Sequence, residues 1–351
     1  MTKEEKIKNF DANGIGQLND GLFGLPFTLD ECDTVLIPVP WEVTVSYGGG
    51  TANGPEAIIK ASYQVDLYDP LVLNAWKKGI GVDVLPAEIK EKSSLLRESA
   101  ENYINALAQG ADENNSELKE ISTRIKKECL WLNDYIKNKA LHFLNKNKTV
   151  GLIGGDHSTP LGLMQALSEK FGKFTILQID AHADLRNAFE GFEFSHASIM
   201  YNALKIKEVE KIVQVGIRDY CEEELNLINT SNGRIKTFFD RDIKYALFNG
   251  DSWDRICNRI IKELPQAIYL SFDIDGLDPK LCPNTGTPVA GGFETEQVLY
   301  LLEKIVKSGR TIIAFDINEV CPGPDGDDWD ANVAARLLFR ISNLVNLSQN
   351  K

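Results

Sequence analysis

Aspartate and histidine side chains recur in this chain at points where an apolar run ends. Asp180, His182 and Asp184 alternate at the end of the apolar run 174–180. Alternate side chains leaving a strand point the same way, so these three can converge on one point. Carboxylate oxygens and imidazole nitrogens form a mixed ligand set that suits Mn, Fe, Ni or Zn. The segment therefore predicts a site for a divalent metal ion.

Two further segments carry the same residue types. His157 follows the paired glycines Gly154 and Gly155 at the end of one run, and Asp273 and Asp275 alternate at the end of another. Taken singly, a structural histidine or an acidic helix cap would explain them. Together with the first segment they supply six ligands, which one ion rarely needs but two ions sharing carboxylates would use. Two such ions would lower the pKa of a bridging water, and we expect that water to attack an electrophilic carbon.

These segments must be positioned by a sheet, because the runs before them have the pattern of buried strands. Continuous runs rich in Val and Ile indicate strands covered on both faces, and helix-periodic stretches between them predict a parallel sheet. Ligands bind at the carboxyl edge of such sheets. The expected strands are 34–40, 79–85, 149–155, 174–180, 211–218, 234–239, 267–275 and 311–320. The expected helices are 55–63, 160–171, 197–206, 253–264, 294–308 and 331–345.

The domain organisation follows from the same pattern. The chain has 351 residues but no internal repeat and no linker rich in Pro or Ser. Seven or eight strands fit one three-layer α/β/α unit, so we expect residues 1–351 to form a single domain. Residues 86–148 depart from the alternation, because they are rich in Glu, Lys, Asn and Ser and predict two or three surface helices with a loop at 108–117. We interpret this segment as a helical insertion over the sheet or an oligomer contact.

Composition excludes several classes of function. The net charge is −13 and no block of Lys and Arg stands clear of acidic residues, so we expect no nucleic-acid partner. The acidic balance suits a cationic small substrate, or solubility alone. The N-terminus lacks an apolar signal-peptide region, and no run reaches the ~18 apolar residues of a membrane span. Six widely spaced cysteines without a C-x-x-C motif predict reduced thiols and a cytoplasmic location.

The motifs resemble those of the ureohydrolase family, which includes arginases, agmatinases, guanidine hydrolases and formimidoylglutamases. The matching segments are GGDHS, DAHAD, SFDIDGLDP, TGTPVAGG and AFDINEV, and the resemblance covers nearly the whole chain from about Asp33. It implies an arginase-like α/β/α fold with a mostly parallel eight-stranded sheet. It also implies a homo-oligomer, a trimer or hexamer, and a small guanidino substrate.

The resemblance further implies a role for each candidate residue. Two divalent ions per chain are expected, with manganese first and nickel as the alternative. One ion would be held by His157, Asp180, Asp184 and Asp273, and the other by Asp180, His182, Asp273 and Asp275, with Asp180 and Asp273 bridging. Glu319 would grip the planar guanidinium through paired charge-assisted hydrogen bonds. His196 would shuttle a proton to the leaving amine, Thr287 would lie near the substrate, and catalysis would involve His196, Glu319 and Asp184.

The substrate is narrowed by departures from the arginase pattern. Arginases carry Asn and Asp where this chain has Arg186 and Cys221, so the grip on an α-amino acid is missing. The Phe194-Ser195-His196 run resembles agmatinases and guanidine hydrolases, whereas Arg186 resembles formimidoylglutamases. We expect metal-bridging hydroxide to attack the guanidinium carbon and release urea, with agmatine favoured as substrate.

The phenylalanines and the arginine near the site are compatible with substrates other than agmatine. Phe189, Phe192 and Phe194 could wall off a pocket for free guanidine, or simply pack the loop. Arg186 either contacts the substrate or forms a salt bridge that holds the loop. As a cation it opposes a second cationic group unless Glu190 or Glu193 neutralises it. Arginine or another guanidino acid, a formimidoylglutamase substrate and a non-catalytic family member follow as further alternatives.

Overall fold

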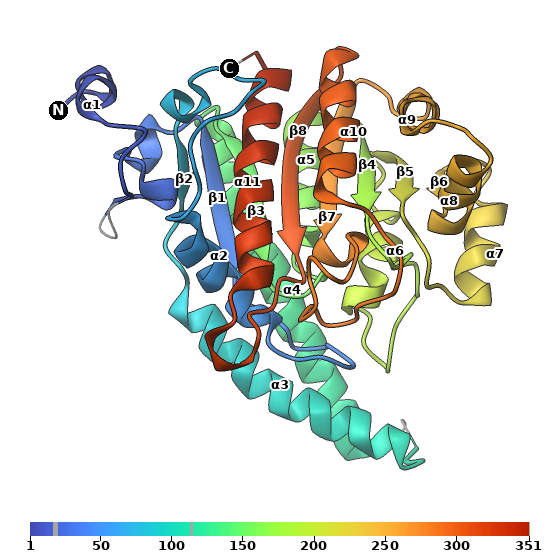
Figure 1. Ribbon diagram of the computed structural model, residues 1–351. Helices are drawn as coiled ribbons and strands as arrows, with labels where there is room; N and C mark the ends of the chain where they lie inside the picture. The colour runs from blue at the N-terminus through green and yellow to red at the C-terminus, as the bar shows by residue number, and fades with distance from the viewer. Residues whose placement is uncertain (17–19, 113–114, 351) are drawn as a thin grey trace.

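A computed structural model describes residues 1–16, 20–112 and 115–350, and shows a central sheet with helices on both faces (Figure 1). The eight strands lie in the order β2-β1-β3-β8-β7-β4-β5-β6. Every pairing is parallel, so the predicted α/β fold is confirmed with a sheet that is entirely, not mostly, parallel. The strands are β1 (Thr34–Val39), β2 (Ile80–Val82), β3 (Thr149–Gly154), β4 (Phe174–Ile179), β5 (Val209–Val215), β6 (Ile235–Phe238), β7 (Ala267–Asp273) and β8 (Thr311–Asn318).

All six predicted helices outside residues 86–148 are present, although α6 is shorter than expected. Three helices were not predicted, namely α1, α7 and α8. They are short and bury at most two residues each, so the core constrains little of their sequence. These helices are α1 (Lys3–Asn9), α2 (Gly54–Ser62), α5 (Leu161–Phe171), α6 (Ile199–Ala203), α7 (Glu222–Thr230), α8 (Asp240–Phe248), α9 (Trp253–Lys262), α10 (Thr295–Lys307) and α11 (Trp329–Ser348).

The region predicted as surface helices forms two long ones, α3 (Ala87–Ala108) and α4 (Ser116–Asn145). They pack side by side and extend past the carboxyl ends of the strands (Figure 1). The predicted loop at 108–117 falls between them, and its residues 113–114 lie outside the described residues. Buried side chains of both helices, such as Leu96 and Ile136, join the core on one face of the sheet.

The core consists of two apolar clusters, one on each face of the sheet. Successive residues of β7 alternate between them: Tyr269 packs with the α3, α4 and α5 side, and Leu270 with the α2, α10 and α11 side. Because both faces are covered, polar side chains that act on a ligand gather at the strand ends. The six cysteines are free thiols. Within the described part of the chain, no helix combines the length and the apolar character that crossing a membrane requires.

Candidate active site

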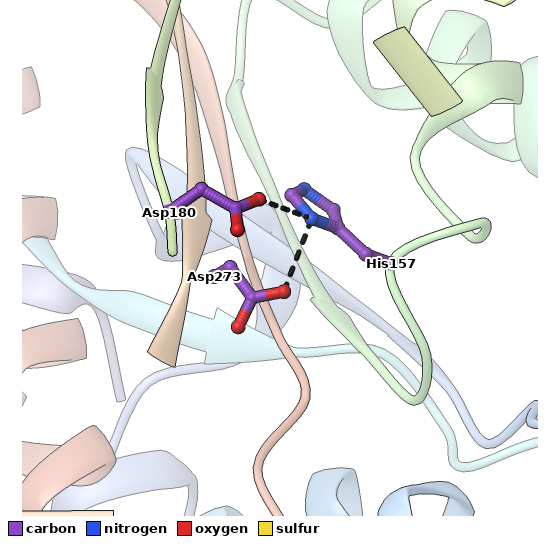
Figure 2. Close-up of side chains that lie close together, drawn as sticks. All are labelled: His157, Asp180 and Asp273. Carbon is purple, nitrogen blue, oxygen red and sulfur yellow. Dashed lines mark ion pairs between the residues drawn. The ribbon is translucent and has the colours of Figure 1, made fainter. Parts of the chain in front are cut away.

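The first group of potential metal ligands surrounds the imidazole of His157 (Figure 2). Nδ1 of His157 lies 3.0 Å from Oδ2 of Asp180, 3.1 Å from Oδ2 of Asp184 and 3.2 Å from Oδ2 of Asp273. These residues come from the ends of β3, β4 and β7, and all four side chains are buried. A single imidazole proton cannot bond to three oxygens at once, whereas one metal ion can be coordinated by all four atoms.

A second group forms around His182. Its Nδ1 lies 2.9 Å from Oδ2 of Asp275 and 3.7 Å from Oδ1 of Asp180. Asp180 thus offers one oxygen to each group. The remaining oxygen of Asp273, Oδ1, accepts a hydrogen bond from the backbone N–H of Asp275 at 2.9 Å. The geometry therefore joins the two groups through Asp180, and bridging by Asp273 stays a prediction.

The polar atoms of these groups fit metal ions. In the described part of the chain, Nδ1 of His157 and Oδ2 of Asp275 are buried and have only the ion-pair contacts given above, with no well-aligned hydrogen bond. An unsatisfied buried group costs roughly 1–3 kcal/mol, and more if charged, so such atoms are typical of a site that binds a cation. Burial and, to a smaller extent, the negative charge of Asp180 raise the pKa of Asp184 to about 7. Carboxylates this close can all be ionised only when cations lie between them.

Metal binding at His182 should release a proton. Burial opposes the charged ring, but the negative charge of Asp275 and its hydrogen bond, together with the charges of Asp180 and Asp184, outweigh burial and raise the pKa of His182 to about 10. The metal-free site is therefore protonated at pH 7–9, and a metal ion must displace that proton. We expect the apparent affinity for Mn²⁺ to rise with pH over this range. Calorimetry in buffers of different ionisation enthalpy should register proton release; binding with no proton release would contradict this account.

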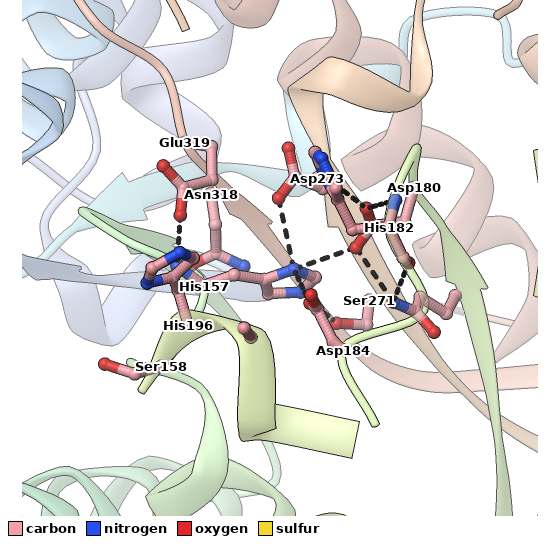
Figure 3. Close-up of polar contacts among 12 residues, drawn as sticks. His157, Ser158, Asp180, His182, Asp184, His196, Ser271, Asp273, Asn318 and Glu319 are labelled. Carbon is pink, nitrogen blue, oxygen red and sulfur yellow. Dashed lines mark hydrogen bonds and ion pairs between the residues drawn. The ribbon is translucent and has the colours of Figure 1, made fainter. Parts of the chain in front are cut away.

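A chain of hydrogen bonds behind His157 fixes the direction of its ring, and Figure 3 labels two of its members, Ser271 and Asn318. Nε2 of His157 lies 2.9 Å from Oγ of Ser271, and that hydroxyl donates to Oδ1 of Asp316 at 3.1 Å. The hydroxyl of Tyr269 and the side-chain amide of Asn318 also donate to Asp316. With its hydrogen on Nε2, His157 presents the lone pair of Nδ1 to the carboxylates, as a metal ligand must.

A second chain supports Asp180 from inside the sheet. Gln178 donates to Oδ2 of Asp180 at 2.8 Å, Gln214 donates to Gln178 at 2.7 Å, and Thr237 donates to Gln214 at 2.7 Å. The sequence reasoning missed these supporting residues, together with Ser271 and Asp316. The signal available was a polar residue inside an otherwise apolar buried strand.

Replacing Ser271 with Ala should weaken metal binding. Loss of the hydroxyl breaks the link between His157 and Asp316, and such outer-shell changes typically cost about 10–100-fold in affinity. Competition with a chelating indicator would measure the dissociation constant. Ser168→Ala, on the far helix α5, is the matched control and should bind as the natural protein does. Unchanged affinity in Ser271→Ala would show that the hydrogen bond does not tune the site.

A cavity of about 170 Å³ opens beside the two ligand groups. It brings together five predicted site residues from the metal and substrate sets, and it adds the exposed Asp219, which follows β5 and was not predicted. Phe189 lines it, whereas Phe192 and Phe194 pack into the core beside α3 and α4. The lining residues are Ser46, His182, Asp184, Arg186, Phe189, His196, Ala197, Asp219, Tyr220, Glu224 and Thr287.

His196 and Glu319 have the properties that their predicted roles require. Burial, together with the smaller effect of positive charge on His182 and His157, lowers the pKa of His196 to about 4, so the ring is neutral at pH 7 and can accept a proton. The buried Glu319 side chain accepts a hydrogen bond from the backbone N–H of His157 at 2.8 Å (Figure 3). Burial raises the pKa of Glu319, and so does the charge of Asp273. A cationic ligand would offset that shift.

The backbone of Glu319 is also unusual. Its φ of +62° is a left-handed conformation that non-glycine residues rarely adopt, and Asp184 has a φ of +54°. Such strain persists only where the surrounding structure imposes it, and it concentrates at functional sites. Here the N–H of Glu319 donates to the carbonyl of Gly155, which holds the carboxylate next to His157.

Arg186 lies over the ring of Phe189, with its guanidinium carbon 4.8 Å from the ring centre. Glu193, which could have neutralised it, is paired instead with Lys126 at 2.6 Å and with Lys205 at 3.2 Å. Burial raises the pKa of Glu190, and the positive charge of Arg97, not that of Arg186, opposes this rise. The positive charge of Arg186 therefore faces the cavity.

Comparisons with known proteins agree with this geometry. The family model "Arginase family" matches residues 32–342. An N(1)-aminopropylagmatine ureohydrolase of Thermus thermophilus is 30% identical over 321 residues, covering 91% of this chain and 92% of the relative. An agmatinase of Cronobacter sakazakii is 32% identical over 218 residues, covering 60% of this chain and 64% of the relative. The crystal structure of an agmatine ureohydrolase of Thermoplasma volcanium is similar in fold, with a TM-score of 0.69 at 20% identity and 99% of each chain covered.

Proposed function

This chain belongs to the arginase family and is a hydrolase of amidine C–N bonds, and on that premise we propose that it converts agmatine and water to putrescine and urea. The observation that supports this most strongly is the convergence of six Asp and His ligands beside Glu319 and His196. We propose two divalent ions per chain, manganese first and nickel as the alternative. When bound, they would supply a water molecule activated for attack at neutral pH.

The side chains of this protein would do the rest. The Glu319 carboxylate would hold the guanidinium by paired charge-assisted hydrogen bonds and fix its carbon for attack. Asp184, a cavity wall as well as a ligand, would orient the attacking water. The neutral His196 would accept a proton and deliver it to the departing amine as the C–N bond breaks. Thr287 would contact the substrate from the opposite loop.

The tail of the substrate would lie against Asp219. This exposed carboxylate lines the same cavity as His196, and it offers a counter-charge to the terminal ammonium of agmatine. The two relatives described above are named for agmatine and aminopropylagmatine, which both carry a cationic tail. Free guanidine is a second candidate, because Arg186 places a positive charge in the cavity and Phe189 limits its width.

A substrate panel tests this proposal. Protein loaded with Mn²⁺ or Ni²⁺ should release urea from agmatine faster than from guanidine or arginine. Asp219→Asn should lower kcat/KM for agmatine by about tenfold and leave guanidine unaffected, because only agmatine has a tail to bind. Asp242→Asn, at an exposed carboxylate of α8, is the control. Urea release from guanidine alone would replace agmatine as the substrate.

We further propose that residues 1–351 act as one domain within a homo-oligomer, a trimer or hexamer, in the cytoplasm. The helical pair formed by α3 and α4 would be an insertion of that domain. Light scattering coupled to size-exclusion chromatography would give the mass of the assembly. A monomeric mass would overturn the oligomer proposal and would leave the proposed reaction unaffected.

A further inference from the structure

We infer that the α3–α4 pair positions the loop that forms one wall of the substrate cavity, through Tyr103 of α3 and Lys126 of α4. The substrate loop is defined here as residues 186–196, and it carries Arg186, Phe189 and His196 into the cavity. The inference rests on the proposed function for its consequence on turnover. The structural part of the inference, that a helical pair remote in sequence holds the loop in place, rests on contacts alone.

The substrate loop has two sides that face different neighbours. Backbone hydrogen bonds of 3.1 and 2.9 Å join Phe189 and Phe192, and the two residues between them, Glu190 and Gly191, have φ values of +50° and +79°. Positive φ at both central residues is the pattern of a type I′ hairpin turn. Phe189 lines the cavity and meets His196 edge-on at 6.1 Å, whereas Phe192 is buried against the helical pair. A shift at Phe192 is therefore passed directly to Phe189.

Both helices contact this turn. The rings of Tyr103 and Phe192 lie 5.0 Å apart, and Nζ of Lys126 lies 2.6 Å from Oε2 of Glu193. The turn approaches so closely that a Cβ on Gly191 would lie 2.3 Å from the hydroxyl oxygen of Tyr103. Only glycine allows the loop and α3 to meet in this way.

The same helix also holds the segment beneath the loop. The Arg97 guanidinium donates to the carbonyls of Val43 and Val45. Between them, the hydroxyl of Thr44 donates to the carbonyl of Phe194 at 3.5 Å. The loop is thus tied to α3 directly through Tyr103 and indirectly through Arg97.

The space between the loop and the helices is not filled. A cavity of about 190 Å³ lies there, walled by Ile125 and Cys129 of α4, by Thr44, and by Phe192 and Phe194 of the loop. Close packing normally resists displacement, and a void removes that resistance. The loop is therefore held over a hollow by point contacts, to Tyr103 and Lys126 of the helical pair and to Asn202 and Lys205 near Glu193, so loss of a contact to the helical pair should loosen it.

Movement of the loop would affect turnover but not the metal site. His196, Phe189 and Arg186 would leave their positions around the substrate, whereas the six metal ligands lie at or just after the ends of β3, β4 and β7, outside the loop. Tyr103 and Lys126 are accordingly positioning residues. They differ from structural residues in that their loss should change loop exchange and kinetics while metal content stays constant.

The test measures amide hydrogen exchange in the natural protein and four variants. In Tyr103→Ala and Lys126→Ala, peptides covering residues 186–196 should exchange at least several-fold faster, with β4 and β7 unchanged. Tyr103→Phe keeps the ring contact and should exchange more slowly than Tyr103→Ala. The control Lys137→Ala removes another ion pair of α4, to Glu169 of α5 at 3.0 Å, and should leave the loop as it is.

Kinetics complete the test. Tyr103→Ala and Lys126→Ala should lower kcat/KM for agmatine by about tenfold or more at unchanged metal content, and Lys137→Ala should not. Unchanged loop exchange in both alanine variants, or equal effects in the control, would overturn the inference. Exchange is measurable without turnover, so a natural protein that releases no urea would overturn the proposed function alone. Lys126, which pairs with Glu193, is exposed, so Lys126→Ala should fold and can test the inference even if Tyr103→Ala does not fold.

Discussion

Glu319→Gln should lower kcat/KM for agmatine by a factor of about 10³ while the protein still binds two metal ions. Glutamine has nearly the same shape, so it can still accept the hydrogen bond from the backbone N–H of His157. It lacks the negative charge, and its NH₂ group would face the N–H donors of the guanidinium. Urea release and metal content, measured on the same preparation, would check the prediction.

The control for this variant is Glu56→Gln, an exposed glutamate of α2 paired with Lys90. It should match the natural protein in both measurements. Near-normal kcat/KM in Glu319→Gln would remove the carboxylate from the proposed guanidinium site. Loss of metal together with activity would reassign Glu319 to supporting His157.

Asp180→Asn should cost both metal ions and nearly all activity. Asp180 is the residue whose two oxygens reach the His157 group and the His182 group. An amide is a neutral and weaker ligand, and its NH₂ group would point at one of the two sites. We expect fewer than two ions per chain and a fall in urea release of about 10³ or more, by atomic absorption and a urea assay.

Asp278→Asn is the matched control, because Asp278 belongs to the same kind of acidic motif but caps a turn by accepting from the N–H of Lys280. It should retain two ions and full activity. Two ions bound to Asp180→Asn with natural affinity would contradict the bridging role of Asp180.

The strands and the ligand cluster could be predicted because each depends on local sequence. Continuous apolar runs mark strands covered on both faces, and the polar residues at their ends must meet at one edge once the strands are parallel. Helices such as α7, which is short and has Glu224 as its one buried residue, are constrained little by the core. The cluster was therefore visible in the sequence, and the helices that bury little were not.

The supporting hydrogen bonds could not be predicted, because they cross between strands that are distant in the chain. Ser271 reaches Asp316 because β8 lies next to β7, and Gln178 reaches Gln214 because β5 lies next to β4. The order of strands is a property of the folded sheet, which local pattern does not carry. Polar residues within apolar strands identify candidates, but their partners follow only from the strand order.

The phenylalanines after Arg186 show a similar limit. Three of them were expected to wall the pocket or to pack the loop, and the turn at Glu190 and Gly191 divides them between both roles. Phe189 faces the cavity, whereas Phe192 meets Tyr103, a residue 89 positions earlier in the chain. That contact depends on where the α3–α4 pair lies, which residues 86–148 alone do not indicate.

The most direct test of the account is a titration of metal-free protein with Mn²⁺, and in parallel with Ni²⁺, while urea release from agmatine is followed. The account predicts that activity is absent without metal, rises with each equivalent, and reaches its plateau at two ions per chain. A plateau at one ion would contradict the binuclear site. Two bound ions with no urea released from agmatine, guanidine or arginine would contradict the proposed chemistry.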